Sequence, residues 1–296
     1  MNLEGVFPPI PTPFHNDAID HRGLAGNVAR WMQTRLAGLV VLGSNGEAPL
    51  LDDAESDAVI ETVRAHVPRE RTLIGGVGRE STAATIAAAK RAARIGIDVA
   101  LVRTPSFYKN VMSNDAFVRY YTAVADACPV PVLLYNVTMF TGVNLLPDAV
   151  ERLAAHPNII GMKESNADLI QLAETIARTP DDFIVFGGSA PTFYHALCAG
   201  ADGGVLAISG VVPDICVDLF DLVRMHRHAE ALALQRRITP LGRLLGAMHG
   251  VAGLKYALDQ IGFVGGPTRA PLGTVPAEAQ AHIREQLAAL GTLAAR

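Results

Sequence analysis

Cysteine, lysine and metal-binding motifs are scarce in this chain of 296 residues. Its three cysteines (Cys128, Cys198 and Cys216) lie far apart without a CxxC pair, which argues against a disulfide framework and a zinc site. The nine histidines form neither an HExxH motif nor a histidine triad, so we expect no metal in the active site. This cysteine usage fits a reducing, cytoplasmic location best.

Long apolar runs and an excess of positive charge are also missing. No apolar stretch reaches the roughly 18 residues that span a bilayer, and the start of the chain has no basic segment followed by an apolar one. We therefore expect a soluble globular protein with no membrane segment and no signal peptide. A net charge of -4 gives no reason to expect nucleic acid or an anionic membrane as a partner.

Short apolar runs alternate regularly with helical segments. The eight runs are residues 6–14, 38–44, 72–78, 98–105, 130–137, 159–165, 183–189 and 203–209. The segments between them, such as 52–67, 81–96, 146–156 and 168–179, carry apolar residues at i, i+3, i+4 spacing, most with Asp or Ser near their starts. This alternation predicts a parallel sheet with right-handed crossovers and, at this count and length, an α/β (β/α)8 TIM barrel.

We expect the barrel to occupy residues 1–212, through the eighth strand. Residues 213–296 are predicted to form the eighth helix and a C-terminal helical extension that packs on the barrel or on a neighbouring subunit. An open, doubly wound sheet is the alternative, and it normally carries GxGxxG after its first strand. Neither that motif nor a GxxxxGK[ST] phosphate loop is present, which favours the barrel.

Polar residues cluster where the predicted strands end, and barrel enzymes carry their reactive groups at that end. Ser44 and Asn45 follow the second strand, and Tyr135 lies at the end of the fifth. Lys163 and Ser165 end the sixth strand, which otherwise consists mainly of core residues. A fully buried lysine is rare unless it is paired or used in chemistry.

Strand alternation indicates where Lys163 points. It places Gly161, Lys163 and Ser165 on one face and Ile160, Met162 and Glu164 on the other. If the first set faces inward, Lys163 lies between two small residues and beside Tyr135 on the preceding strand. Loss of hydration there favours the neutral amine, which is a nucleophile toward carbonyls. The alternative is a buried ion pair between Lys163 and Glu47 or another carboxylate.

The other candidates also have simpler structural explanations. Residues 44–46 (Ser-Asn-Gly) are ordinary turn residues, and Tyr135 could be a core tyrosine with a satisfied hydroxyl. Residues 187–189 (Gly-Gly-Ser) could cradle a phosphate, as barrels do near strands seven and eight, or could form only a turn. A phosphate-binding barrel isomerase therefore stays open as an alternative function.

Five segments stand out along the chain: GSNGEAPLL (43–51), TPSFYKN (104–110), YNVTMFTGVNL (135–145), GMKESNADL (161–169) and GADGGVLAISGVVP (200–213). Together they resemble the marker segments of the dihydrodipicolinate synthase / N-acetylneuraminate lyase superfamily. The chain looks most similar to 4-hydroxy-2-oxoglutarate aldolase, because it shares GSNGE, GMK-x-S and a GGP-x-RAP tail at 265–271. The resemblance implies a homotetramer (a dimer of dimers), no cofactor, and a Schiff base with a 2-oxo acid, usually pyruvate.

The resemblance also implies a role for each residue at the strand ends. Lys163 would form the Schiff base, and Tyr135 would relay protons to and from it. Ser44 and Asn45 would hold the pyruvyl carboxylate, with Ser44 joining the relay. Ser165 would line the same pocket.

Further positions are implied at the edges of this pocket. Main chain near Gly188 and Leu206 would close it around the pyruvyl group. The relay tyrosine that a neighbouring subunit contributes in this superfamily falls on Phe107 by straight count, one residue before Tyr108. Either the loop shifts so that Tyr108 serves, or the relay runs without this residue.

One departure bears on the substrate. Synthases that condense pyruvate with aspartate semialdehyde carry an arginine in the loop after the strand-five tyrosine, and this sequence has Phe140 there. We therefore expect a metal-independent lyase that cleaves a 4-hydroxy-2-oxo acid, such as 4-hydroxy-2-oxoglutarate, to pyruvate and an aldehyde. The alternatives are a 2-keto-3-deoxy sugar acid dehydratase, a dihydrodipicolinate synthase, and a keto-acid-binding scaffold without turnover.

Overall fold

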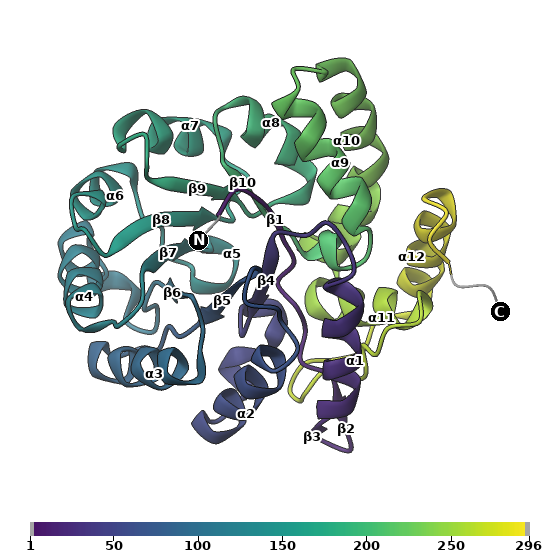
Figure 1. Cartoon of the computed structure of the whole chain (residues 1–296), viewed down its shortest axis with the longest axis horizontal. Coiled ribbons are helices and arrows are strands. Elements are labelled where there is room, and N and C mark those ends of the chain that lie inside the picture. The colour runs from purple at the N-terminus through teal and green to yellow at the C-terminus, as the bar shows by residue number, and fades with distance from the viewer. Residues whose placement is uncertain (1–2, 294–296) are drawn as a thin grey trace.

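A computed structural model describes residues 3–293, and within them an eight-stranded parallel sheet lies at the centre of a ring of helices (Figure 1). Its strands are β1 (Gly5–Phe7), β4 (Gly38–Val41), β5 (Thr72–Gly76), β6 (Val99–Arg103), β7 (Val132–Asn136), β8 (Ile159–Glu164), β9 (Ile184–Gly187) and β10 (Gly203–Val205). The sheet order runs from β1 through β10 and back to β4. It closes because Val40 donates to the Pro8 carbonyl, and Ile10 donates to that of Val40, each at 3.0 Å. The predicted TIM barrel is confirmed.

Each barrel strand is followed along the chain by a helix on the outside of the barrel (Figure 1). These helices are α1 (His21–Trp31), α2 (Asp53–Arg64), α3 (Thr82–Ile95), α4 (Asn114–Ala127), α6 (Pro147–Ala154), α7 (Leu169–Arg178), α8 (Phe193–Cys198) and α9 (Pro213–Arg224). Shorter turns in the loops are η1 (Ser44–Gly46), η2 (Ala48–Leu50), η3 (Lys109–Val111), α5 (Thr138–Thr141), η4 (Ala190–Thr192) and η5 (Ala207–Gly210). The predicted caps are present at Asp52, Ser81 and Asp168, whose side chains accept hydrogen bonds from first-turn amides.

The first and eighth strands are shorter than the sequence predicts. β1 ends at Phe7 because several of the next residues are prolines, which have no N–H for a strand ladder. The rest of that run enters a small antiparallel hairpin of β2 (Phe14–His15) and β3 (Ala18–Ile19). β10 ends at Val205 because η5 begins two residues later.

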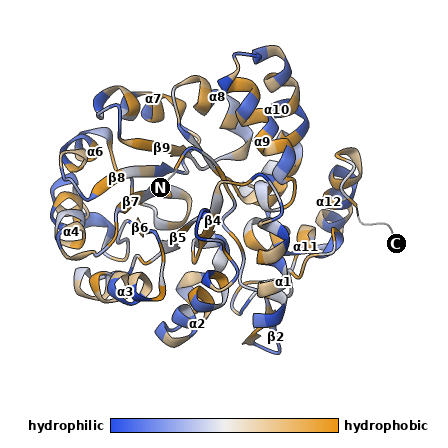
Figure 2. Ribbon diagram, in the orientation of Figure 1, coloured by the Kyte–Doolittle hydropathy of each residue, from blue (hydrophilic) through white to orange (hydrophobic). Residues whose placement is uncertain are grey.

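Two apolar layers hold the barrel together. The inner layer fills the barrel and consists of Leu3, Phe7, Val40, Ile74, Val99, Leu101, Leu133, Tyr135, Val137, Phe186 and Val205. The larger outer layer lies between the strands and the surrounding helices, and Trp31, Phe117 and Met162 belong to it. Figure 2 shows the corresponding pattern, with hydrophobic residues along the strands and mixed colouring on the helices. No helix within residues 3–293 is both long and apolar enough to cross a membrane.

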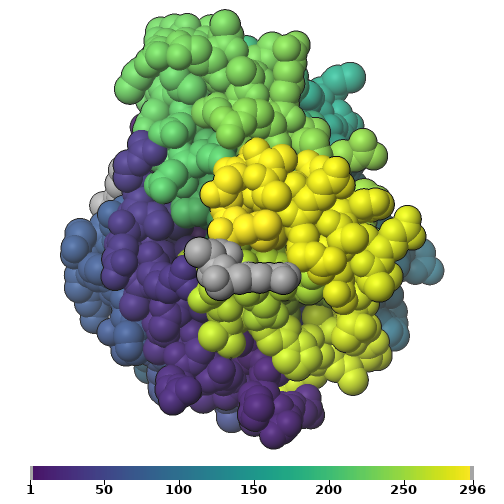
Figure 3. All heavy atoms as spheres, turned by 90° about the vertical axis from the view of Figure 1, so that its right-hand side faces the viewer, coloured from purple at the N-terminus to yellow at the C-terminus, as the bar shows by residue number. Residues whose placement is uncertain are grey.

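The C-terminal extension packs against the barrel, as predicted. It consists of α10 (His228–Arg243), the π-helical turn η6 (Leu244–Met248), α11 (Gly250–Gln260) and α12 (Ala277–Ala289). Figure 3 shows this part of the chain covering one side of the molecule beside the N-terminal segment. α11 contacts η1 directly, so the extension reaches the loop that follows β4.

A buried ion pair joins the extension to that loop. The ammonium of Lys255 in α11 pairs with the carboxylate of Glu47, and both side chains are almost fully buried. Lys255 also donates to the Pro267 carbonyl at 2.7 Å, and the other Glu47 oxygen accepts from the Arg269 amide at 2.8 Å. Burial lowers the pKa of Lys255, although the hydrogen bond to Glu47 opposes this shift.

A second buried carboxylate lies on the outer face of β8. Glu164 accepts hydrogen bonds from Asn136 at 2.8 Å, from Gln171 of α7 at 2.9 Å, and from the Asn166 amide at 2.7 Å. Burial raises its pKa from 4.5 to about 6, while these hydrogen bonds oppose the shift. Glu164 therefore fixes the end of β8 to the preceding strand and to its own helix.

Replacing Lys255 with methionine tests the buried ion pair. Lys255→Met leaves the Glu47 carboxylate buried without its counter-charge, so the free energy of unfolding should fall by about 3–5 kcal/mol. The matched control is Lys90→Met on an exposed face of α3, which should change it by less than about 0.5 kcal/mol. Urea unfolding of the three proteins gives the comparison, and equal stabilities would show that the pair contributes nothing.

Glu164 should make stability depend on pH. Its folded pKa of about 6 exceeds the usual 4.5, so the folded state binds more protons between these values and stability falls as pH rises through that window. The fall should amount to about 2 kcal/mol. Glu164→Gln should remove this decline from urea-unfolding free energies measured across the window, whereas Glu61→Gln, on an exposed surface, should keep it. Parallel profiles for the wild type and Glu164→Gln would contradict the assignment.

Candidate active site

A cavity of about 440 Å³ opens at the carboxyl ends of the barrel strands. It brings together most of the residues predicted from the sequence, namely Ser44, Asn45, Tyr135, Lys163, Ser165 and Gly188. Leu206 does not line it, although its neighbours Val205 and Ala207 do. The strand-end rule applied to the sequence therefore locates the cavity.

Lys163 lies buried beside Tyr135. The two residues are direct partners in the β7–β8 register, and the Lys163 Nζ lies 4.3 Å from the centre of the Tyr135 ring. Only 4% of Lys163 is exposed, and no carboxylate in residues 3–293 forms an ion pair with it. The predicted alternative of a Lys163–Glu47 pair is wrong, because Glu47 pairs with Lys255 from the C-terminal extension.

The hydroxyl of Tyr135 meets that of Ser44 at 3.1 Å. Ser44 begins η1. Leu42, shortly before this turn, and Glu47, directly after it, have left-handed backbone conformations with φ of 56° and 55°. Such conformations are costly for residues other than glycine, and they concentrate at functional sites. The ion pair between Lys255 and Glu47 anchors the end of this turn to α11. Ser44, at the start of the same turn, is thereby held beside Tyr135.

The predicted alternation along β8 holds for Lys163 and fails at Ile160. The β7–β8 register shifts between Val132 and Leu133, so that Leu133 pairs with Gly161 and Ile160 is left over. This irregularity turns Ile160 toward the inner apolar layer, although alternation places it on the outer face. Beyond it, Lys163 faces the cavity and Glu164 faces the helices, as predicted.

The Gly-Gly-Ser segment after β9 acts as a close-packed turn. A Cβ on Gly188 would lie 2.1 Å from the Ser165 hydroxyl, so only glycine fits beside that residue. The Gly188 amide donates to the Glu164 carbonyl at 2.7 Å, which leaves it unavailable to a phosphate. This use of the amide favours the simple turn over the phosphate cradle, one of the two explanations that the sequence leaves open.

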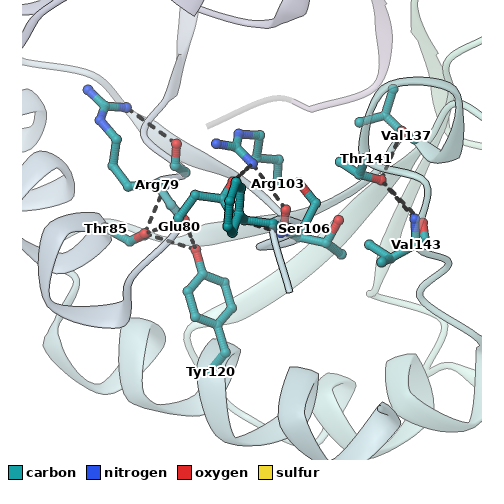
Figure 4. A network of polar contacts seen from close by, with 12 residues as sticks. Arg79, Glu80, Thr85, Arg103, Ser106, Tyr120, Val137, Thr141 and Val143 are labelled. Atoms are coloured by element: carbon teal, nitrogen blue, oxygen red, sulfur yellow. Dashed lines mark hydrogen bonds and ion pairs between the residues drawn. The ribbon is translucent and has the colours of Figure 1, made fainter. Parts of the chain in front are cut away.

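The loop after β6 carries Phe107 and Tyr108 away from the cavity. Their exposed fractions are 77% and 69%, and neither lines it. Glu80 anchors this loop by accepting from the Ser106 amide at 2.8 Å and from the Phe107 amide at 2.9 Å, beside Arg103 (Figure 4). Burial opposes ionisation of Glu80, but these hydrogen bonds and Arg103 hold its pKa below the usual value.

Sequence reasoning missed two features of the site. Arg243, at the end of α10, lines the same cavity as Lys163. The second feature is Lys255, which lies in an apolar helical segment (GLKYAL). A lysine among apolar residues could have indicated a buried ion pair, and the structure shows that pair with Glu47. No local pattern marks Arg243, because only the packing of the extension brings it to the strand ends.

Comparisons with known proteins match this fold. The profile of the dihydrodipicolinate synthetase family matches residues 2–290. A 4-hydroxy-tetrahydrodipicolinate synthase of Xanthomonas campestris is 34% identical over 92% of this chain and 89% of its own length. One from Archaeoglobus fulgidus is 32% identical over 97% and 98%. The structure of the chloride-inhibited dihydrodipicolinate synthase of Acinetobacter baumannii complexed with pyruvate superposes with a TM-score of 0.94, at 27% identity, over 99% and 100% of the two chains.

The names of these relatives do not support the expected 4-hydroxy-2-oxoglutarate aldolase. The relatives are named 4-hydroxy-tetrahydrodipicolinate synthases, and nothing points to that aldolase in particular. The family profile matches nearly the whole chain, in agreement with the barrel fold. The chain therefore belongs to the dihydrodipicolinate synthetase family and is a metal-independent lyase of that family.

Proposed function

We propose that Lys163 forms a Schiff base with the ketone of a 2-oxo acid and that the protein makes or breaks the carbon–carbon bond next to it. One observation carries this proposal: a buried amine, which forms no ion pair with any carboxylate in the described part of the chain, faces a cavity beside Tyr135. An amine that is not held in an ion pair is open to attack a ketone in the cavity, and lysine amines form Schiff bases with carbonyl substrates. A keto-acid-binding scaffold has no use for such a residue.

The cleavage reaction would follow from this arrangement in balanced steps. The Lys163 amine adds to the C2 carbonyl, and uptake of one proton from solvent with loss of one water gives the protonated imine. The C4 hydroxyl proton leaves through the Tyr135–Ser44 pair while the C3–C4 bond breaks and its electron pair moves onto the imine. An aldehyde departs, the resulting enamine takes a proton at C3, and water releases pyruvate from Lys163.

The remaining predicted residues would bind the pyruvyl group. Asn45 follows Ser44 in η1, and Ser165 lies two residues beyond Lys163, so both flank the position of an imine. Neutral amide and hydroxyl groups can donate to a carboxylate without competing with Lys163 for charge. Gly188 allows the Ser165 side chain to pack directly against its backbone, because it has no side chain of its own.

Two aldehydes are candidates for the partner of pyruvate, as a substrate in condensation or as a product in cleavage. The names of the relatives support aspartate semialdehyde, the substrate of the synthases. Phe140 argues against aspartate semialdehyde, because it lines the cavity at the position where the resemblance places the synthase arginine. Cleavage of 4-hydroxy-2-oxoglutarate to glyoxylate is then the other candidate reaction. Both reactions use the same imine and differ only in the aldehyde.

Assembly into a homotetramer is part of the same proposal. Phe107, Tyr108 and Val111 are exposed on one loop, and Met139 and Phe140 are exposed on α5. Exposed apolar groups of this kind are typical of protein interfaces. Association here would bring a neighbour's aromatic side chains toward the cavity; sedimentation velocity showing only monomers would refute it.

Turnover assays test the proposed reaction. The wild type should release pyruvate from 4-hydroxy-2-oxoglutarate or condense pyruvate with aspartate semialdehyde, and Lys163→Ala should lose on the order of 10³-fold or more in kcat. Lys90→Ala, which changes an exposed lysine of α3, should retain full activity. Persistent turnover in Lys163→Ala would exclude the imine. Loss of a hydroxyl from a 2-keto-3-deoxy sugar acid, without pyruvate release from 4-hydroxy-2-oxoglutarate, would favour the dehydratase instead.

A further inference from the structure

Within the residues that the structure describes, the cavity is lined by two charged side chains, and both are cations. One is Lys163 at the strand ends and the other is Arg243 from the C-terminal extension. The other lining residues are neutral, with hydroxyl and amide groups such as Ser165, Asn166 and Thr138 among them. A cavity with this charge pattern favours an anionic ligand.

Close packing places Arg243 at the cavity. The preceding residue, Gly242, lies so near η4 that a Cβ on it would be 3.0 Å from the Ala190 side chain. α10 therefore ends directly against the turn that follows β9. The chain then widens into the π-helical turn η6, whose Leu245 and Gly246 line the same cavity. Such π-helical turns are frequent at functional sites.

Arg243 is available to a ligand. In residues 3–293 its guanidinium forms no ion pair and no hydrogen bond, and the residue is exposed. Other arginines near the strand ends are already engaged, since Arg103 pairs with Glu80 and Arg269 pairs with Glu55. A guanidinium with all its donors free can bind a carboxylate through two parallel hydrogen bonds.

We infer that Arg243 binds a carboxylate at the end of the substrate remote from the imine. The preferred substrates would then be 2-oxo acids with a second carboxylate, or aldehydes that carry one, and this rests on the proposed function of Lys163. Phe140 lines the same cavity and supplies an apolar wall instead of a charge. Arg243 is thus a specificity-determining residue contributed by the C-terminal extension, on an element different from that of Phe140.

Calorimetric binding of two 2-oxo acids tests this role. 2-Oxoglutarate has a second carboxylate and 2-oxobutanoate does not, so Arg243→Gln should weaken binding of the former by about 10- to 100-fold. Binding of 2-oxobutanoate should change by less than about twofold, because its contacts lie near Lys163. Arg237→Gln, on an exposed part of α10 that does not line the cavity, should leave both affinities unchanged.

The role of Arg243 and the proposed function of Lys163 can be refuted independently of each other. Equal weakening of both ligands, no weakening of 2-oxoglutarate, or no binding of 2-oxoglutarate to the wild type would overturn the role of Arg243. Measurements in the Lys163→Ala background, where no imine can form, should show the same Arg243 dependence. Failure of the turnover assays with this dependence intact would contradict the proposed function and support the carboxylate site.

Discussion

Within residues 3–293, two lysines are buried, one on a barrel strand and one in the C-terminal extension, and their surroundings differ. Lys255 forms an ion pair with Glu47, whereas Lys163 lies beside the Tyr135 ring and pairs with no carboxylate of the described residues. A buried lysine is usually paired with an opposite charge, and a lysine in such a pair is engaged by its partner. The rest of the site depends on this difference, because an amine that is already paired cannot attack a carbonyl.

Both the barrel and its extension contribute to the difference between the surroundings of Lys163 and Lys255. β7 and β8 set Lys163 opposite Tyr135, and the hydrogen bonds of Glu164 fix the outer side of the same strand. Glu47, the carboxylate that the sequence suggests as a partner for Lys163, is occupied by Lys255. The extension therefore acts at two points, by neutralising this carboxylate and by bringing Arg243 to the cavity.

Local sequence patterns predicted the barrel and the residues that cluster at its strand ends. Lys163 and Tyr135 could be placed together because strand alternation and parallel pairing follow fixed geometry. The inward position of Ile160 could not be predicted, because the sequence of neither strand reveals a shift in the register between them. The early end of β1 could have been anticipated from the prolines that follow Phe7.

Local sequence patterns could not predict the contacts that the C-terminal extension makes. Lys255–Glu47 joins residues more than two hundred positions apart, and Arg243 reaches the cavity through the packing of Gly242 on η4. Helical periodicity indicates which face of a helix is buried but not which loop it covers. The resemblance supplied the chemistry of the strand ends and gave no expectation for either contact.

Borohydride reduction in the presence of pyruvate tests the central claim most directly. Reduction converts an imine into a stable adduct, and mass spectrometry of the digested protein identifies the modified lysine. We predict a pyruvyl adduct on the peptide that contains Lys163 and none at that position in Lys163→Ala. An unmodified Lys163, or an adduct confined to Lys90, Lys109 or Lys255, would contradict the account.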